Sequence, residues 1–402
     1  MKPVIINKNT LITYIFFIFS PIFSIPLILI QLFNNVNKGM VLLISALYAL
    51  LSFKYIPNIT NDKKRYIERF DLFSGYDFKE LINYFVTVKR PDFVFDGINF
   101  AFSKLGLGVN YFFFFITFVT IYLYFCFIKL QCSKMSNKKF LFGIFTVLFV
   151  VFSVSLPSIF SGVRFLFAGS IFVWGVYFLF ADDRRLWLVF CLFLTSALTH
   201  YSFILLIFAA LFSVVNYKRV VISLILFVSL LLLFGTSVAK ESFESILSFL
   251  TLPESYLNKA SLYMQEDIES SFNAKILSFL RHLWLFYLMV FLFFNYERNS
   301  KYYAFIVNLV FVVCFVSFID TAFYRYALFL KILFVPYVFY LSTKRESAGT
   351  NVNFLLFSVF YFLGFVVDIV VIRDNIAASY SSGVWSLYEI LTTSNADISL
   401  VE

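Results

Sequence analysis

Residues Leu186–Val215 form a continuous apolar stretch, LWLVFCLFLTSALTHYSFILLIFAALFSVV, that contains no Lys, Arg, Asp or Glu. As a single helix it would be roughly 45 Å long at 1.5 Å per residue, whereas the hydrocarbon core of a bilayer is about 30 Å thick. The markedly polar patch within it is Thr199-His200-Tyr201-Ser202. We therefore predict two membrane-spanning helices that meet in a short turn at His200.

The composition of the whole chain agrees with a membrane location. Hydrophobic residues make up 61% of the 402 residues and charged residues 14%, against roughly 45–50% and 25% in soluble domains. Lipid must therefore be the solvent for most of the surface, which excludes a soluble fold. The net charge of +9 comes mostly from short loops, where Lys and Arg orient helices, so no nucleic-acid partner is implied.

Further apolar stretches of about 20 residues predict an all-α bundle of about twelve transmembrane helices. The expected spans lie near residues 10–33, 40–56, 109–130, 140–156, 164–181, 186–199, 201–215, 220–238, 277–295, 302–318, 322–341 and 353–371. No repeat or Gly/Ser-rich linker divides the chain. We expect one membrane domain over residues 1–402, ending in a tail at 372–402.

The positive-inside rule predicts which loops face the cytoplasm. Lys and Arg occur in alternate short loops, at Lys38, Lys134, Lys138, Lys139, Arg184, Arg185, Lys218, Arg219, Arg298, Lys301, Lys344 and Arg345. The intervening turns near Val163, Tyr201 and Thr321 hold none. The two longer loops, 57–108 and 239–276, are therefore expected to be external, and both have helical character.

Several ionisable residues fall inside or beside the predicted spans, near their outer ends. They are Arg164, His200, Arg281, His282, Asp320, Arg325 and Asp368, with Lys331 about 9 Å deeper than Arg325 on the same helix. Each cation alone could be a headgroup anchor, and Arg325 could pair with Asp320 or Lys331 with Asp368. Their number on the outer side instead favours a cationic cavity for an anionic, lipid-linked ligand, because guanidinium groups match phosphate oxygens.

His200 is one of two histidines, and a neutral imidazole can accept a proton. A hydrogen-bonded structural role in the turn is the alternative. The sequence contains no P-loop, dinucleotide fingerprint, H-E-x-x-H or G-x-S-x-G motif, nor an outer Asp-x-Asp element. Chemistry that depends on a nucleotide sugar or a metal is therefore not indicated, whereas a donor activated on a lipid diphosphate needs neither.

An ordered set of short motifs resembles the Wzy-type polysaccharide polymerases, in particular their EpsG-like branch. The set comprises Arg69 followed by Gly75-Tyr76-Asp77-Phe78 and Tyr84, then Arg90-Pro91-Asp92-Phe93, Gly162-Val163-Arg164, His200-Tyr201-Ser202, and finally Arg325-Tyr326 with Pro336. The resemblance covers roughly residues 10–340. Phe165-Leu166-Phe167 departs from the more polar helix start expected in that family.

The resemblance implies metal-independent, cofactor-free and inverting glycosyl transfer between two undecaprenyl-diphosphate-linked oligosaccharides. The fold would resemble the GT-C-like membrane glycosyltransferases, and the site would face the periplasm or exterior of a bacterial cytoplasmic membrane. Membrane lipid and a chain-length regulator protein are the further partners implied. Arg164 and Arg325 would hold the donor diphosphate, and either His200 or Asp77 would take the acceptor proton. The remaining predicted substrate-binding residues are Arg69, Arg281, Tyr326 and Lys331.

Two other classes of protein would also need a cationic cavity. A lipid-linked oligosaccharide flippase or other transporter should show an internal repeat and polar residues in both halves of the membrane. An O-antigen ligase shares the outer Arg and His pattern, so only a substrate assay separates it from a polymerase.

Overall fold

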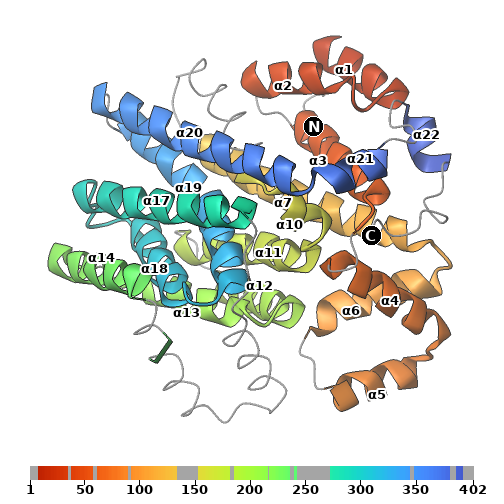
Figure 1. Ribbon diagram of the computed structural model, residues 1–402, viewed down its shortest axis with the longest axis horizontal. Coiled ribbons are helices and arrows are strands. Elements are labelled where there is room, and N and C mark those ends of the chain that lie inside the picture. The colour runs from red at the N-terminus through yellow and green to blue at the C-terminus, as the bar shows by residue number, and fades with distance from the viewer. Residues whose placement is uncertain are drawn as a thin grey trace.

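The computed structural model describes residues 8–34, 38–57, 61–88, 92–133, 153–181, 185–215, 217–235, 240–241, 272–344, 348–380 and 386–392. All regular secondary structure in these residues is helical (Figure 1). The predicted all-α class is therefore confirmed. The expected span at 140–156 and the external loop at 239–276 lie largely outside the described residues.

The helices follow the predicted apolar stretches closely. In the first half of the chain they are α1 (Lys8–Phe19), α2 (Ile25–Asn34), α3 (Lys38–Lys54), α4 (Asp62–Gly75), α5 (Phe78–Val88), α6 (Phe93–Lys104), α7 (Val109–Ser133), α10 (Leu156–Phe160), α11 (Val163–Phe180) and α12 (Leu186–Thr199). In the second half they are α13 (Phe203–Phe212), α14 (Arg219–Phe234), α17 (Phe272–Phe294), α18 (Lys301–Phe315), α19 (Asp320–Lys344), α20 (Ala348–Val371), α21 (Arg373–Tyr380) and α22 (Leu387–Thr392).

The break predicted in the first apolar stretch is present. Helix α12 ends at Thr199 and α13 begins at Phe203, so His200 lies in the turn between them. The prediction of one helix over residues 10–33 is wrong, because α1 ends at Phe19 and α2 begins at Ile25. Pro21 lacks the backbone N–H that a continuous helix needs, and Ser24 Oγ instead donates to the Pro21 carbonyl at 2.6 Å within the connecting turn.

Two helices among the described residues are long and apolar enough to cross a membrane, Val109–Leu130 and Val163–Phe180. A third candidate is the pair Leu355–Val371 and Arg373–Tyr380, which is bent by 63°. Six shorter apolar helices accompany them, including Leu186–Thr199, Phe203–Phe212 and Lys301–Phe315. Together they indicate a helical membrane protein, and the number of about twelve spans remains a prediction.

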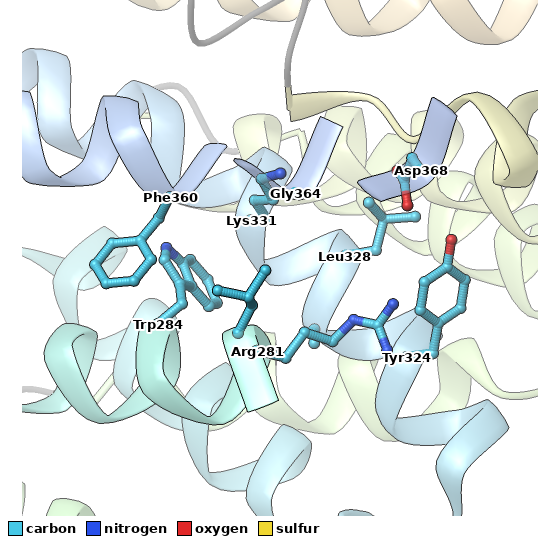
Figure 2. Close-up of a pocket in the computed structure, with 10 residues that line it drawn as sticks. Arg281, Trp284, Tyr324, Leu328, Lys331, Phe360, Gly364 and Asp368 are labelled. Atoms are coloured by element: carbon cyan, nitrogen blue, oxygen red, sulfur yellow. The ribbon is translucent and has the colours of Figure 1, made fainter. Parts of the chain in front are cut away.

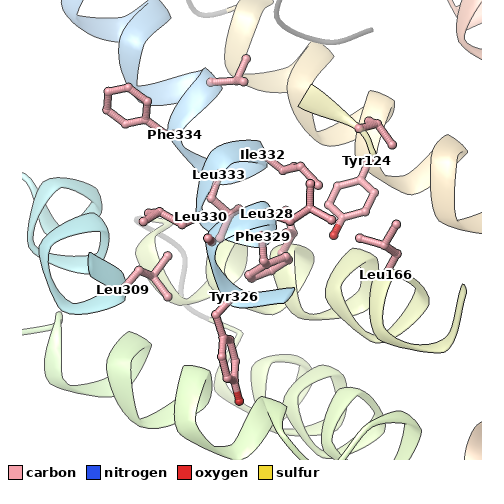
Figure 3. Close-up of a cluster of buried hydrophobic side chains, with 14 of the residues drawn as sticks. Tyr124, Leu166, Leu309, Tyr326, Leu328, Phe329, Leu330, Ile332, Leu333 and Phe334 are labelled. Atoms are coloured by element: carbon pink, nitrogen blue, oxygen red, sulfur yellow. The ribbon is translucent and has the colours of Figure 1, made fainter. Parts of the chain in front are cut away.

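The centre of the bundle is built around α19. Helix α7 packs along α3 and α11, α11 packs along α12, and α19 contacts α7, α11, α18 and α20. Figure 3 shows α19 surrounded by core side chains, with Tyr124 of α7 and Leu166 of α11 on one side and Leu309 of α18 on another. Phe329 and Leu333 of α19 are completely buried in this core. Residues 320–333 are therefore held by apolar packing over most of their length.

Helices α7, α11 and α19 approach closely at Gly169. A Cβ atom at this position would lie 2.6 Å from Tyr124 Oη and 2.7 Å from Phe329 Cε2. We expect Gly169→Val to lower the free energy of unfolding by about 1–3 kcal/mol, because both rings must move within a packed core. The measurement is the melting temperature and membrane abundance of the purified variant.

Gly97 in α6 is the matched control for Gly169, since an added Cβ there meets nothing within 4 Å. Gly97→Ala should leave the melting temperature equal or slightly higher, because alanine is the better helix former. Equal melting temperatures for Gly169→Val and the parent protein would contradict the close approach of the three helices.

The first predicted external loop consists of α4, α5 and α6, which lie at one end of the bundle (Figure 1). Helices α4 and α6 pack on each other, and α6 also contacts α7 and α12. The α4–α6 segment follows α3 in the chain, and hydrogen bonds attach α21 to the C-terminal end of α3 and the residues just after it. Asn375 Nδ2 donates to the Ile56 carbonyl at 3.1 Å, Ile56 N donates to Ser379 Oγ at 2.8 Å, and Tyr380 Oη donates to the Leu51 carbonyl at 2.8 Å.

Candidate functional site

Two of the ion pairs made by carboxylates of the α4–α6 segment join this segment to the bundle. Asp62 Oδ2 accepts from Arg325 Nη2 of α19 at 2.8 Å, and Asp92, directly before α6, accepts from Arg164 Nη1 of α11. Within the segment, Asp96 Oδ1 accepts from Arg69 Nη1 at 3.0 Å. The Arg164–Asp92 side chains are only 14% and 13% exposed. Arginines from α4, α11 and α19 are thus each held by an aspartate of residues 62–96.

Tyr66 of α4 lies between these pairs. The guanidinium carbons of Arg69 and Arg164 lie 5.4 Å and 5.7 Å from the centre of its ring, a range in which a cation is attracted to an aromatic face. Burial raises the pKa of Tyr66, and the charges of Arg164, Arg325 and Arg69 oppose that rise. All three arginines are therefore close enough to act on one phenol group.

Asp96 is the completely buried carboxylate of this cluster. Burial raises the pKa of Asp96, while the positive charges of Arg69 and Arg164 act in the opposite direction. Asn99, one turn later in α6, is also buried and donates to the Tyr66 carbonyl at 3.3 Å. These contacts fix α6 against α4, so the carboxylates have defined positions relative to Arg164.

Lys63 attaches the start of this segment to α3. Its Nζ donates to the Ser52 carbonyl at 2.6 Å and to the Tyr55 carbonyl at 2.8 Å, and it lies 4.6 Å from the centre of the Phe113 ring. Carbonyls at the C-terminal end of a helix attract positive charge. Complete burial lowers the pKa of Lys63 to about 7. Asp62 and Tyr66 are therefore placed beside Arg325 and Arg164 by a buried anchor.

His200 lies at the same end of the bundle as these arginines. Its ring packs edge-on against Phe165 with centres 5.3 Å apart, and its Nδ1 is 2.7 Å from Ser202 Oγ. Tyr326 Oη donates to the Ser202 carbonyl at 2.7 Å, and the Tyr326 and Phe165 rings are 6.0 Å apart. His200 and Tyr326 thus meet around Phe165 and Ser202. Arg164 and Arg325 are the chain neighbours of Phe165 and Tyr326, but their guanidinium groups bind Asp92 and Asp62 of the α4–α6 segment.

Phe165, the unexpected apolar residue at the start of α11, has a structural explanation. It is 4% exposed, and besides His200 and Tyr326 it contacts the rings of Phe203 and Phe329. Its position under the imidazole orients His200 by packing. A polar residue in this place would need its own hydrogen-bond partners.

Asp77 has a different environment from His200. It is exposed, its Oδ1 accepts from Glu80 N at 2.7 Å, and its own N–H donates to Glu80 Oε2 at 2.7 Å. This reciprocal pair is a capping box at the start of α5. The carboxylate of Asp77 therefore stabilises a helix terminus on the surface of the α4–α6 segment.

Arg281 and Lys331 belong to a second polar site, a pocket between α17, α19 and α20. Figure 2 shows Arg281 reaching towards the Tyr324 ring, with Lys331 and Asp368 on the neighbouring helices. The Arg281 guanidinium carbon lies 4.0 Å from the centre of that ring, and Lys331 Nζ lies 4.6 Å from the centre of the Tyr361 ring. The single cavity expected from the sequence is thus divided into two sites on different faces of α19.

The sequence interpretation missed the carboxylates that pair with the arginines and the aromatic residues of the pocket. Arg325 pairs with Asp62 rather than with Asp320 as the sequence had allowed. A signal for the pocket existed in the helical spacing of Phe360, Gly364 and Asp368, which repeats every four residues and places them on one face. The pairing with Asp62 had no such signal, because 263 residues separate the two partners.

No curated protein and no solved structure is significantly similar to the chain. The EpsG family model matches residues 39–382, which include all but the first residue of α3, every described helix from α4 to α21, and both polar sites. Because this match covers well over half of the sequence, the chain belongs to the EpsG family, which is linked to exopolysaccharide biosynthesis.

Proposed function

We propose that the protein is a polysaccharide polymerase of the bacterial cytoplasmic membrane. It transfers an oligosaccharide from one undecaprenyl diphosphate onto a second lipid-linked repeat unit at the outer face. The observation that supports this proposal is that Arg164 and Arg325 both bind aspartates of the α4–α6 segment around Tyr66, while His200 packs on Phe165, the residue next to Arg164. The proposed fold is a bundle of about twelve spans similar to the GT-C-like membrane glycosyltransferases.

In the proposed reaction, an acceptor hydroxyl oxygen bonds to the anomeric carbon of the donor sugar while the bond from that carbon to the diphosphate oxygen breaks. The hydroxyl proton passes to His200 Nε2, and undecaprenyl diphosphate leaves with the bonding electron pair. His200 can act in this way when its Nδ1–H donates to Ser202 Oγ, because the other ring nitrogen is then the acceptor. Asp77 is the less suitable base because its carboxylate caps α5.

Arg164 and Arg325 have the chemistry needed for the leaving group. Each is held through one terminal nitrogen by an aspartate, and a guanidinium has further N–H groups with which it can bind phosphate oxygens. Groups that are fixed before the reaction stabilise developing negative charge most effectively. The aspartates would thus act as supports that hold the two arginines in place.

Deletion of the gene tests the proposed function against its alternatives. For a polymerase, gels of surface glycan should show single repeat units in place of long chains, and a plasmid copy of the gene should restore the chains. Loss of all exported glycan would indicate a flippase, and full-length glycan that is exported but unattached would indicate a ligase. Either result would refute the proposal.

A further inference from the structure

Two buried hydrogen-bond donors belong to residues that line the pocket between α17, α19 and α20. The described part of the chain supplies no acceptor for either donor. Within that part, neither Arg281 Nη2 nor Trp284 Nε1 has an acceptor within hydrogen-bonding distance. Both residues line the pocket. Buried polar groups are nearly always hydrogen-bonded in folded proteins. The pocket is therefore suited to a ligand that is rich in acceptor oxygens.

The charges around the pocket favour an anion. Arg281 and Lys331 contribute two positive charges and Asp368 one carboxylate. The Arg281 guanidinium lies over the Tyr324 ring. Hydrogen bonds fix this ring, since Tyr324 Oη is 2.9 Å from Ser155 Oγ and accepts from Ser158 Oγ at 3.2 Å. The guanidinium therefore has a defined position before any ligand binds. A fixed arginine beside a lysine is an arrangement typical of phosphate-binding sites.

The walls of the pocket are apolar around these charged groups. Leu280, Ala327, Leu328 and Phe360 line it together with Gly364. A Cβ atom at Gly364 would lie 3.0 Å from Lys331 Nζ, so the glycine leaves room beside the ammonium group. Apolar walls with two cations match a phosphate group that is attached to a hydrocarbon chain better than they match a freely soluble sugar.

The geometry of α19 separates this pocket from the Arg164–His200 site. Tyr324, Leu328 and Lys331 line the pocket, and their spacing of four and three residues places them on one helical face. Arg325 is turned by about 100° from Tyr324 and bonds to Asp62, while Tyr326 bonds to the Ser202 carbonyl. One helix thus carries two polar sites on two of its faces.

We infer that the Arg281–Lys331 pocket binds the phosphate head group of a polyprenyl diphosphate, separately from the Arg164–His200 site. Polymerisation joins two lipid-linked substrates, so this inference, which rests on the proposed function, gives the second diphosphate a site of its own. Arg281 binds phosphate oxygens through its terminal nitrogens, Lys331 contributes an additional positive charge, and Asp368 accepts hydrogen bonds from hydroxyl groups of the attached sugar.

The test is lipid binding by the purified full-length protein in detergent, followed by native mass spectrometry and titration. Undecaprenyl diphosphate is the probe, and undecaprenol, which lacks the phosphates, is the comparison lipid. We expect the double variant Arg281→Gln/Lys331→Met to bind one lipid diphosphate fewer than the parent protein. Where titration resolves this site, its Kd should rise roughly 10- to 100-fold, since charge-assisted hydrogen bonds are lost.

Two further variants make this result specific. Gly364→Val keeps both cations but fills the space beside Lys331 Nζ, so it should also lose the pocket-bound lipid even if the double variant fails to fold. Arg373→Gln is the matched arginine control, because Arg373 is 71% exposed and faces an exposed Asp374. It should bind as the parent does.

Equal binding of undecaprenyl diphosphate by the parent, the double variant and Gly364→Val would overturn the inference. So would undecaprenol binding that these variants reduce to the same extent. If inorganic diphosphate displaces the bound lipid, the site recognises the anion alone. If it does not, binding also needs the lipid chain, and both results agree with a phosphate site. Failure of the proposed function is separate, because it would appear as a glycan pattern other than single repeat units after gene deletion, whatever the pocket variants bind.

Discussion

Arg164→Gln is expected to produce a protein that is both less stable and unable to form polymer. The substitution leaves Asp92, which is 13% exposed, without its cation in a poorly solvated place. Removal of one partner of a buried ion pair typically costs about 3–5 kcal/mol. The measurements are the melting temperature in detergent and the length of the surface glycan.

A double-mutant cycle with Asp92 separates the two contributions of Arg164. Asp92→Asn combined with Arg164→Gln removes both charges, so the melting temperature should recover much of the loss while polymer remains absent. Asp92→Asn alone should lower stability but retain polymer, because the guanidinium is still present. Polymer of normal length from the double variant would show that the ion pair serves the fold alone.

Replacement of Arg164 or Arg325 by lysine tests whether the guanidinium itself is required. Lysine retains the charge but lacks the planar arrangement of donors. Both variants should reduce polymer at normal protein abundance, and full activity of both would leave only a general need for positive charge.

His200→Gln should reduce the rate of glycosyl transfer by roughly 10²-fold or more while lipid-linked substrate still binds, because a general base contributes at least that factor. Glutamine retains hydrogen bonding to Ser202 but cannot take up a proton. The parent enzyme should also slow as the pH falls, since the protonated imidazole is no longer an acceptor. The measurement is the initial rate with purified lipid-linked repeat units under saturating substrate.

Asp77→Asn is the matched variant for this experiment. Asparagine is as good an N-cap as aspartate, so the start of α5 should persist and the rate should remain near that of the parent. A rate within a few-fold of the parent for His200→Gln, together with a large loss for Asp77→Asn, would move the role of base to Asp77. Ser202→Ala should give an intermediate rate, because it removes the partner of Nδ1.

The sequence predicted most helices because apolar length is a local property. The turn at His200 followed from the length limit together with the polar patch Thr199-His200-Tyr201-Ser202, and the structure places it between Thr199 and Phe203. The grouping of Arg164, His200 and Arg325 in one functional site remains a prediction, which rests on helix ends expected to finish on the same side. Sidedness, unlike contact, is specified by the loops nearest to each helix.

The division into two sites was not predictable in the same way. Which face of α19 meets which neighbour depends on how α7, α11, α17 and α20 pack around it, and no periodic pattern of α19 itself reveals that arrangement. Asp62, Asp92 and Asp96 lie in the segment predicted to be an external loop, where carboxylates are ordinarily solvated. Their pairing with arginines follows from the docking of that segment, which sequence spacing does not encode.

The contacts between the end of α3 and α21 have a consequence for the order in which the protein matures. The chain is synthesised from its N-terminus, yet the partner of Asp62 lies 263 residues later and that of Ile56 lies 319 residues later. Until α19 and α21 have been synthesised, Asp62 lacks Arg325 and the end of α3 lacks Asn375. The Arg325–Asp62 pair therefore forms late in biosynthesis, and a chain truncated before α19 cannot form it.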